Sequence, residues 1–303
     1  MELFCLVVAL LLAGTRPLES WLPLPQGLGR WADWVEKTCN AGAYGHGICA
    51  WSVAVAGPVL LVMLLQSLLA ATLPLLEPVL IVALLYAGLG FATTRRVFAE
   101  IQLALRLGET ERARQRLAEW LGRPAPERDA EVARLAISTA LKAMHRQLLA
   151  PLVAYLLLPG AAGVVLYRLA ERVQAHWQRT TTQENTVFSE FSRRVFGIID
   201  WLPLRATAAA FAVVGNFEDA VYCWRTRSVS GLNQDEDLIL ASAAGALGVP
   251  LGGVAMEGGK AAERVGSIGD DAEAMQSAAG LVQRAVLLWL LLLFLLGLAS
   301  LVG

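Results

Sequence analysis

The chain has 303 residues, of which 56% are hydrophobic and 17% are charged, and its mean hydropathy is +0.54. Soluble globular domains carry about 25% charged residues, so a wholly soluble protein is excluded. The formal net charge of −1 excludes the basic excess that is typical of nucleic-acid binding, and no nucleic acid is expected as a partner. The composition predicts an integral membrane protein whose apolar spans alternate with polar segments.

The first apolar run covers residues 3–13 and is followed by basic residues. The positive-inside rule then places the N-terminus outside and residues 14–46 in the cytoplasm. A full crossing needs about 20 residues, so we expect this run to be tilted, partly re-entrant or continued by residues 18–24.

Residues 48–69 and 73–91 are predicted as the second and third spans, and Glu77 is the one ionisable residue within them. A carboxylate inside a membrane is a candidate functional residue. Pro74 and Pro78 flank Glu77, which favours a position in a short turn between the two spans, near the membrane interface.

Residues 92–147 are of a different kind, with 11 Lys/Arg against 7 Asp/Glu. Apolar residues recur there every three to four positions, in two stretches that Gly108 separates. The pattern predicts a cytoplasmic helical hairpin.

A fourth apolar segment, residues 148–167, is broken at Pro159-Gly160 and has basic flanks on both sides, so its topology stays open. Residues 196–224 form an amphipathic stretch in which Pro203 is expected to break the helix. Residues 281–302 are the clearest span.

The sequence predicts no metal site from its cysteines and histidines, because neither type shows the short spacings of metal ligands. Two interpretations of the acidic run Asp235-Glu236-Asp237 stay open. The run could hold Mg²⁺, or it could form the N-terminus of a helix, where acids complement the helix dipole. The second is favoured.

Two sequence blocks resemble the CobD/CbiB family of membrane proteins, which act late in cobalamin biosynthesis. Residues 200–208, DWLPLRATA, are similar to the family's N-x-[IL]-P-A-R-L-T-A. Residues 230–233, SGLN, and 241–253, ASAAGALGVPLGG, resemble its S-P-N and A-M-A-G-A-L-G-V-x-L-G-G. Ala150-Pro151-Leu152 and Tyr167-Arg168 are similar to two further family anchors.

The departures from the family pattern remove acidic residues. The family has E-N-x-x-D-G where this chain has Lys142, Ala143, Arg146 and Gln147, and N-T-x-D-S where it has residues 171–175, ERVQA. The chain also resembles AmpE-type inner-membrane proteins, which are associated with β-lactamase regulation, through D-W-x-P-x-R and a C-terminal span. That resemblance implies the alternative of a non-catalytic membrane sensor or regulator.

The CobD/CbiB resemblance implies a multi-pass protein of the bacterial inner membrane, related to adenosylcobinamide-phosphate synthase. That enzyme would join adenosylcobyric acid to aminopropanol or its phosphate, with ATP and Mg²⁺. Whether this chain catalyses that reaction stays open. The implied partners are the lipid bilayer, a corrinoid intermediate and other membrane proteins. The residues that survive as substrate-binding candidates are Asp200, Arg205, Asn233, Asp235, Gly252 and Gly253.

Arg205 and Asp200 also have an alternative, structural role. Arg205 could pair with a substrate phosphate or extend to the membrane interface. Asp200 is expected to cap the helix that Pro203 breaks. Asn233 and the glycine pair could together hold an anion.

The expected fold is an all-α integral membrane protein with four to five transmembrane or re-entrant helices and a cytoplasmic helical domain. The expected organisation is, in order, an N-terminal membrane region, the cytoplasmic hairpin, a CobD/CbiB-like core with a glycine loop, a linker and a C-terminal transmembrane helix (residues 1–91, 92–147, 148–253, 254–280 and 281–303).

Overall fold

The computed structural model describes residues 2–15, 24–39, 44–158, 160–180, 186–229, 235–251 and 268–302. About 90% of the described residues are helical, and none of them forms a strand. The all-α prediction is therefore confirmed.

The helices group into two compact units that interleave along the chain. Unit 1 contains residues 1–90 and 146–203, and unit 2 contains residues 91–145 and 204–303. The predicted division of the chain into five consecutive segments is a different description, and it remains a prediction.

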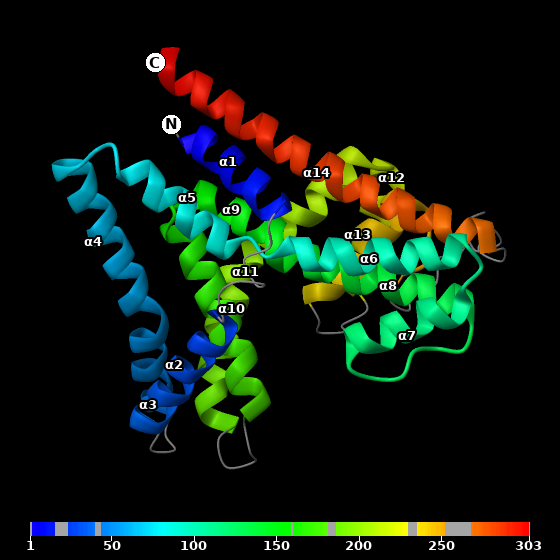
Figure 1. The fold of residues 1–303 in the computed structure, drawn as a ribbon, viewed down its shortest axis with the longest axis horizontal. Coiled ribbons are helices and arrows are strands. Elements are labelled where there is room, and N and C mark those ends of the chain that lie inside the picture. Colours follow the sequence, from blue (N-terminus) through cyan, green and yellow to red (C-terminus); the bar gives the residue numbers. More distant parts are fainter. Residues whose placement is uncertain are drawn as a thin grey trace. The chain divides into compact units, whose positions relative to one another are not determined.

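Unit 1 is an assembly of short and long helices (Figure 1). Within it, α1 packs against α5, while α10 packs against α9, α5, α2 and η2. The elements are α1 (Glu2–Thr15), α2 (Leu24–Cys39), α3 (Tyr44–Trp51), the π-helical turn η2 (Ser52–Ala56), α4 (Gly57–Thr72), α5 (Glu77–Gly88), the turn η3 (His145–Leu149) from its second residue on, α9 (Ala150–Leu157), α10 (Ala162–Thr180) and the first part of α11 (Thr186–Val214).

The core of unit 1 forms where α10 meets α2 and η2. Tyr167 and Trp177, both on α10, are its largest buried side chains. The indole Nε1 of Trp177 donates a 3.3 Å hydrogen bond to the backbone oxygen of Ala32 on α2. This hydrogen bond and the buried rings of Tyr167 and Trp177 hold α10 against α2 and η2.

Unit 2 contains the remaining helices, of which α6 packs against α7, α8 and α14, and α12 packs closely against α13. Gly108, with a φ of +73°, forms the turn between α6 and α7, as the sequence predicts. The elements are α6 (Phe91–Arg106), α7 (Thr110–Leu121), α8 (Asp129–Met144), the last part of α11, α12 (Phe217–Val229), α13 (Asp235–Leu247) and α14 (Ile268–Val302).

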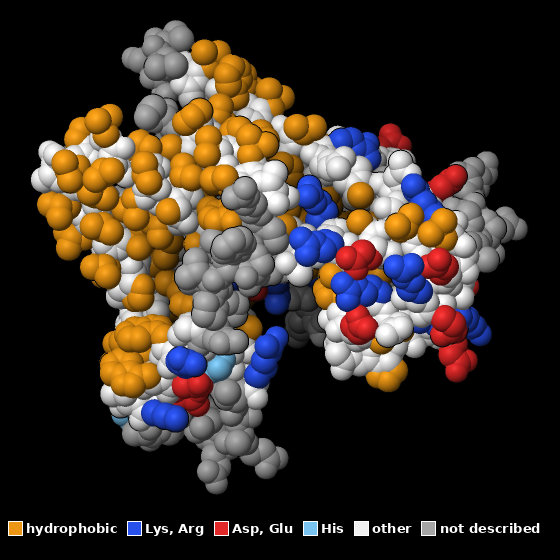
Figure 2. Space-filling model, in the orientation of Figure 1, with side chains coloured by type: hydrophobic (Ala, Val, Ile, Leu, Met, Phe, Trp, Pro, Cys, Tyr) orange, Lys and Arg blue, Asp and Glu red, His pale blue; other side chains and the backbone are white. Residues whose placement is uncertain are grey.

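Within the described part of the chain, four helical stretches are long and apolar enough to cross a membrane: Gly45–Thr72, Glu77–Arg106, Ser189–Val214 and Asp271–Ala299. Leucines on α4 are widely exposed, and Figure 2 shows hydrophobic side chains spread over α4 and α5, while charged side chains gather over α7. The predicted number of spans is therefore confirmed. Residues 3–13 form only a short apolar helix, and residues 148–167 divide into α9 and α10.

The expected break at Pro203 is wrong. α11 continues through Pro203 as a single helix of 29 residues. Pro203 is buried, and a proline inside a helix is tolerated where surrounding packing compensates for the lost backbone hydrogen bond. Asp200 therefore lies inside α11 and is not a helix cap.

Candidate functional site

A buried tyrosine and four charged side chains, from three elements of unit 1, form one cluster. We call Arg146, Tyr167, Arg168, Glu171 and Asp200 the Tyr167 cluster. η3 supplies the first, α10 the next three and α11 the last. Hydrogen bonds and electrostatic interactions connect them, although 54 residues separate the first from the last in sequence.

The contact between Tyr167 and Asp200 joins α10 to α11. The phenolic hydroxyl donates a 2.9 Å hydrogen bond to Oδ1 of the carboxylate. Tyr167 is fully buried and Asp200 is 7% exposed. The ring of Tyr167 also contacts that of Phe196, one helical turn before Asp200, at a centroid distance of 5.7 Å. Asp200 is therefore held as a hydrogen-bond acceptor inside the unit.

Arg168 forms a second buried connection. Its Nη1 lies 2.6 Å from Oε2 of Glu171, and the two side chains are 10% and 15% exposed. The same nitrogen donates a 3.3 Å hydrogen bond to the backbone oxygen of Arg146. The Nε of Arg168 is buried and has no hydrogen-bond partner among the described residues. The guanidinium therefore retains one inward donor that an anionic group could use.

The charges of the cluster balance, with two arginines against two carboxylates. Burial raises the pKa of Tyr167 well above its ordinary value, and the negative charge of Asp200 raises it further, while Arg146 opposes the shift. Tyr167 therefore stays protonated at neutral pH and acts as a hydrogen-bond donor.

The described donors do not fit a resident Mg²⁺. Mg²⁺ requires oxygen ligands in near-octahedral geometry, and the described residues contain no group of three or more potential ligands. Within the cluster, Asp200 accepts from Tyr167, and Glu171 is paired with Arg168. No catalytic step through Mg²⁺ or ATP follows from these residues.

The structure describes the predicted binding residues unevenly. Asp200 belongs to the cluster, and Arg205 is half-buried on the part of α11 that belongs to unit 2. Asp235 opens α13, so the acidic run occupies the first turn of a helix, in agreement with the favoured interpretation. Asn233, Gly252 and Gly253 lie outside the described residues.

Family-like positions in unit 2 take part in helix packing. Nδ1 of His145 lies 3.0 Å from Oγ1 of Thr207, and the hydroxyl of Ser242 donates a 2.7 Å hydrogen bond to the backbone oxygen of Ala208. At Gly245, an added Cβ would lie 2.3 Å from the backbone oxygen of Asp219. This part of the glycine-containing block therefore allows α13 to approach α12 closely.

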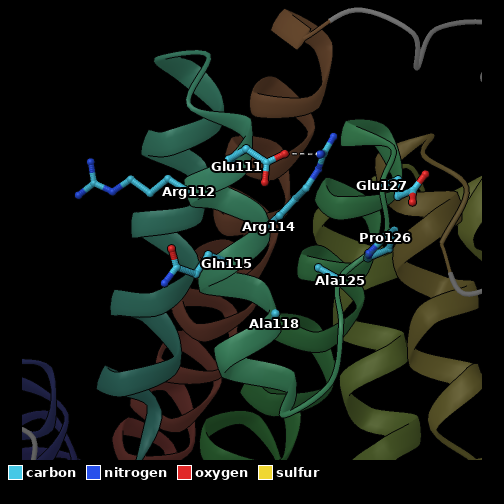
Figure 3. Close-up of a pocket in the computed structure, with 8 residues that line it drawn as sticks. All are labelled: Glu111, Arg112, Arg114, Gln115, Ala118, Ala125, Pro126 and Glu127. Carbon is cyan, nitrogen blue, oxygen red and sulfur yellow. Dashed lines mark hydrogen bonds and ion pairs between the residues drawn. The ribbon is translucent and has the colours of Figure 1, made fainter.

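A shallow groove of about 510 Å³ lies on unit 2 between α7 and the segment that precedes α8 (Figure 3). Arg114 is paired there with Glu111 at 2.6 Å and with Asp129 at 2.9 Å. None of the predicted site residues lines this groove. The Nε of Arg114 is buried and has no hydrogen-bond partner among the described residues, as at Arg168. The Tyr167 cluster is the preferred candidate site because it contains Asp200, one of the predicted binding residues.

Four members of the cluster are not among the binding candidates predicted from sequence: Arg146, Tyr167, Arg168 and Glu171. Tyr167-Arg168 was recognised only as a family anchor. Arg146 and Glu171 stand at positions where the family has other residues, so the sequence pattern marks them only as departures from the family. The sequence feature that indicates the cluster is the presence of polar residues in three segments aligned with the family, which the fold brings together.

Comparisons with known proteins identify the family of the chain. A family model described as CobD/Cbib protein matches residues 6–289. "Cobalamin biosynthesis protein CobD" of Chromobacterium violaceum is 33% identical over 250 residues, which cover 80% of this chain and 79% of that protein. The protein of the same name from Stutzerimonas stutzeri is 33% identical over 277 residues, which cover 88% of each chain. No solved structure matches the chain significantly.

Proposed function

The chain belongs to the CobD/CbiB family, and we propose that it acts in cobalamin biosynthesis as a multi-pass protein of the bacterial inner membrane. The observation that carries the proposal is the family match across residues 6–289, together with two relatives that share most of their length with this chain. The described residues include four helical stretches that are long and apolar enough to cross a membrane, which supports this location.

The specific reaction in this proposal is the synthesis of adenosylcobinamide phosphate. An amide bond forms between a carboxyl group of adenosylcobyric acid and the amine of aminopropanol or its phosphate. The new C–N bond replaces a carboxyl C–O bond, the amine loses a proton, and the released oxygen leaves with the phosphoryl or nucleotidyl group that ATP supplies. The corrinoid is therefore the proposed substrate, and ATP and Mg²⁺ are supplied as co-reactants. We also propose that the lipid bilayer and other membrane proteins are its partners, because the chain is a membrane protein.

The Tyr167 cluster is the proposed binding site for an anionic group of these substrates. Arg168 supports this role, because its Nε is a buried donor without a partner among the described residues. Its Nη1 is at the same time held by Glu171 and by the backbone oxygen of Arg146. A guanidinium fixed on one side is pre-organised to donate on the other.

A direct conversion assay tests this proposal. The purified full-length protein in detergent is supplied with adenosylcobyric acid, aminopropanol phosphate, ATP and Mg²⁺, and the amide product is detected by mass spectrometry. A family member with intact acidic motifs serves as the positive control. Product at a rate near that of the control supports the proposal, whereas no product beside a working control refutes the ligase activity for these substrates.

One observation favours a second candidate, a non-catalytic membrane sensor or regulator of the AmpE type. Lys142 and Arg146 occupy positions where the family has acids, and Glu171 is held in an ion pair with Arg168. A carboxylate engaged in this way is not free to bind a cation or act as a base. This candidate predicts that deleting the gene changes β-lactamase induction and leaves cobalamin levels unchanged.

A further inference from the structure

The hairpin of α4 and α5 carries polar groups in an otherwise apolar part of unit 1. A cavity of about 560 Å³, here called the hairpin cavity, lies between α1, α4, α5 and the turn at Gly160. Its lining is largely apolar, but it includes the side chains of Gln66, Ser67 and Glu77. All of these elements belong to unit 1.

Gln66 presents an unused donor to this cavity. Its side chain is buried, at 8% exposure, and its Nε2 has no hydrogen-bond partner among the described residues. The amide lies against the backbone of Gly160, where an added Cβ would be 2.7 Å from Nε2. Because a buried donor without a partner is unfavourable, the amide is suited to a ligand oxygen.

Glu77 supplies a negative charge that no cation in the lining balances. It lies in the first turn of α5, is half-buried, and forms no ion pair within the described part of the chain. The lining contains no lysine, arginine or histidine. The hydroxyl of Ser67 is already used, because it donates a 2.8 Å hydrogen bond to the backbone oxygen of Leu64. The cavity therefore combines one carboxylate with one free amide donor.

The position of the cavity indicates what can reach it. The turn between α4 and α5 carries Leu73, Leu75 and Leu76, which are 52%, 88% and 49% exposed. Exposed apolar residues gathered in this way mark a surface that contacts lipid or another protein. It also joins two of the stretches that are long and apolar enough to cross a membrane, so we expect it to lie where the apolar core of the bilayer meets the headgroup layer.

We propose that the hairpin cavity binds a primary ammonium group, which Glu77 pairs with while the amide of Gln66 donates to an oxygen of the same ligand. Two sources present this chemistry, an ethanolamine phospholipid headgroup and a free amino alcohol. The site is separate from the Tyr167 cluster. Binding of the lipid headgroup is independent of the proposed amide synthesis, whereas binding of a free amino alcohol rests on that proposed function, because aminopropanol is its amine substrate.

The first test measures lipid preference. The full-length protein is reconstituted in nanodiscs of equal parts ethanolamine, choline and glycerol phospholipids, and the lipids retained after a detergent wash are quantified by mass spectrometry. We expect about tenfold enrichment of the ethanolamine lipid over the choline lipid, whose methylated nitrogen cannot donate. Glu77→Gln and Gln66→Leu should remove the enrichment.

Two further variants serve as controls for this test. Glu77→Asp keeps the charge and should keep the enrichment, which shows that loss in Glu77→Gln is not caused by misfolding. Glu127→Gln removes a carboxylate from the groove on unit 2 and should change nothing.

The second test identifies the source. In nanodiscs of glycerol phospholipid alone, binding of 1-amino-2-propanol is followed by saturation-transfer NMR for the wild type and for Glu77→Gln. Enrichment of the ethanolamine lipid alone assigns the site to a lipid, and Glu77-dependent amine binding alone assigns it to a free amino alcohol, so either supports the proposal. Absence of both signals, or their persistence in Glu77→Gln, overturns it. Neither readout requires turnover, so failure of the conversion assay remains a separate result.

Discussion

The hydroxyl of Tyr167 donates a 2.9 Å hydrogen bond to Oδ1 of Asp200, which joins α10 to α11 inside a buried core. A buried carboxylate is stable only when polar partners replace the water that it has lost. This one hydrogen bond therefore both joins two helices and supplies a polar partner to the buried carboxylate of Asp200.

Replacing Tyr167 by phenylalanine should destabilise the protein by about 1–3 kcal/mol, because the substitution removes a donor from a buried carboxylate without opening a large cavity. Thermal unfolding in detergent, followed by tryptophan fluorescence, measures the change. Tyr222→Phe is the matched control, since Tyr222 is 61% exposed, and its unfolding temperature should stay close to that of the wild type. Asp200→Asn keeps an acceptor and should cost less than Tyr167→Phe. Equal stability of Tyr167→Phe and wild type would contradict the argument.

Arg168→Met should destabilise the protein more strongly, by about 3–5 kcal/mol, because it leaves the carboxylate of Glu171 largely buried without its cation. Arg194→Met provides the comparison, since Arg194 pairs with Glu190 on an exposed face, with side chains 62% and 34% exposed. Such a surface pair contributes about 0–1 kcal/mol. Similar losses in the two variants would show that the pair of Arg168 and Glu171 is not buried as described.

The sequence was sufficient for features that depend on local pattern. Apolar length predicted spans that overlap α4, α5 and α14, and Gly108 predicted the turn between α6 and α7. The Tyr167 cluster could not be predicted in this way, because it depends on contacts between segments that are distant in sequence. The helix break expected at Pro203 failed for a related reason, since packing around a proline is not visible in the residues next to it.

The family-like glycine block shows how one motif can carry a structural meaning that the sequence leaves undecided. Glycine pairs and turns suggested an anion site, and Gly252 and Gly253 lie outside the described residues. At Gly245, however, the nearest backbone of α12 leaves no room for a side chain. Small residues allow helices in membrane proteins to approach one another closely.

Gly245→Ala should therefore lower stability by about 1–3 kcal/mol, since the new Cβ would lie 2.5 Å from the Cα of Ala220 and force α12 away from α13. Gly280→Ala tests the same chemical change on α14, where an added Cβ meets nothing within 4 Å. There alanine should be neutral or slightly stabilising, because it favours the helix. Chemical denaturation of both variants gives the difference, and a neutral Gly245→Ala would argue against the close packing of these helices.

Arg168→Lys separates the binding role of Arg168 from its structural role. Lysine keeps the positive charge beside Glu171 but has a single nitrogen, so it cannot also supply the inward donor that Nε provides. If the amide-forming activity is present, we expect the KM for aminopropanol phosphate or for the corrinoid to rise about tenfold, the loss expected for one charge-assisted hydrogen bond, while kcat changes less. Arg116→Lys, on the exposed face of α7, should leave both constants unchanged. An unchanged KM in Arg168→Lys, measured with a variant that unfolds at the wild-type temperature, would place substrate binding elsewhere in the chain.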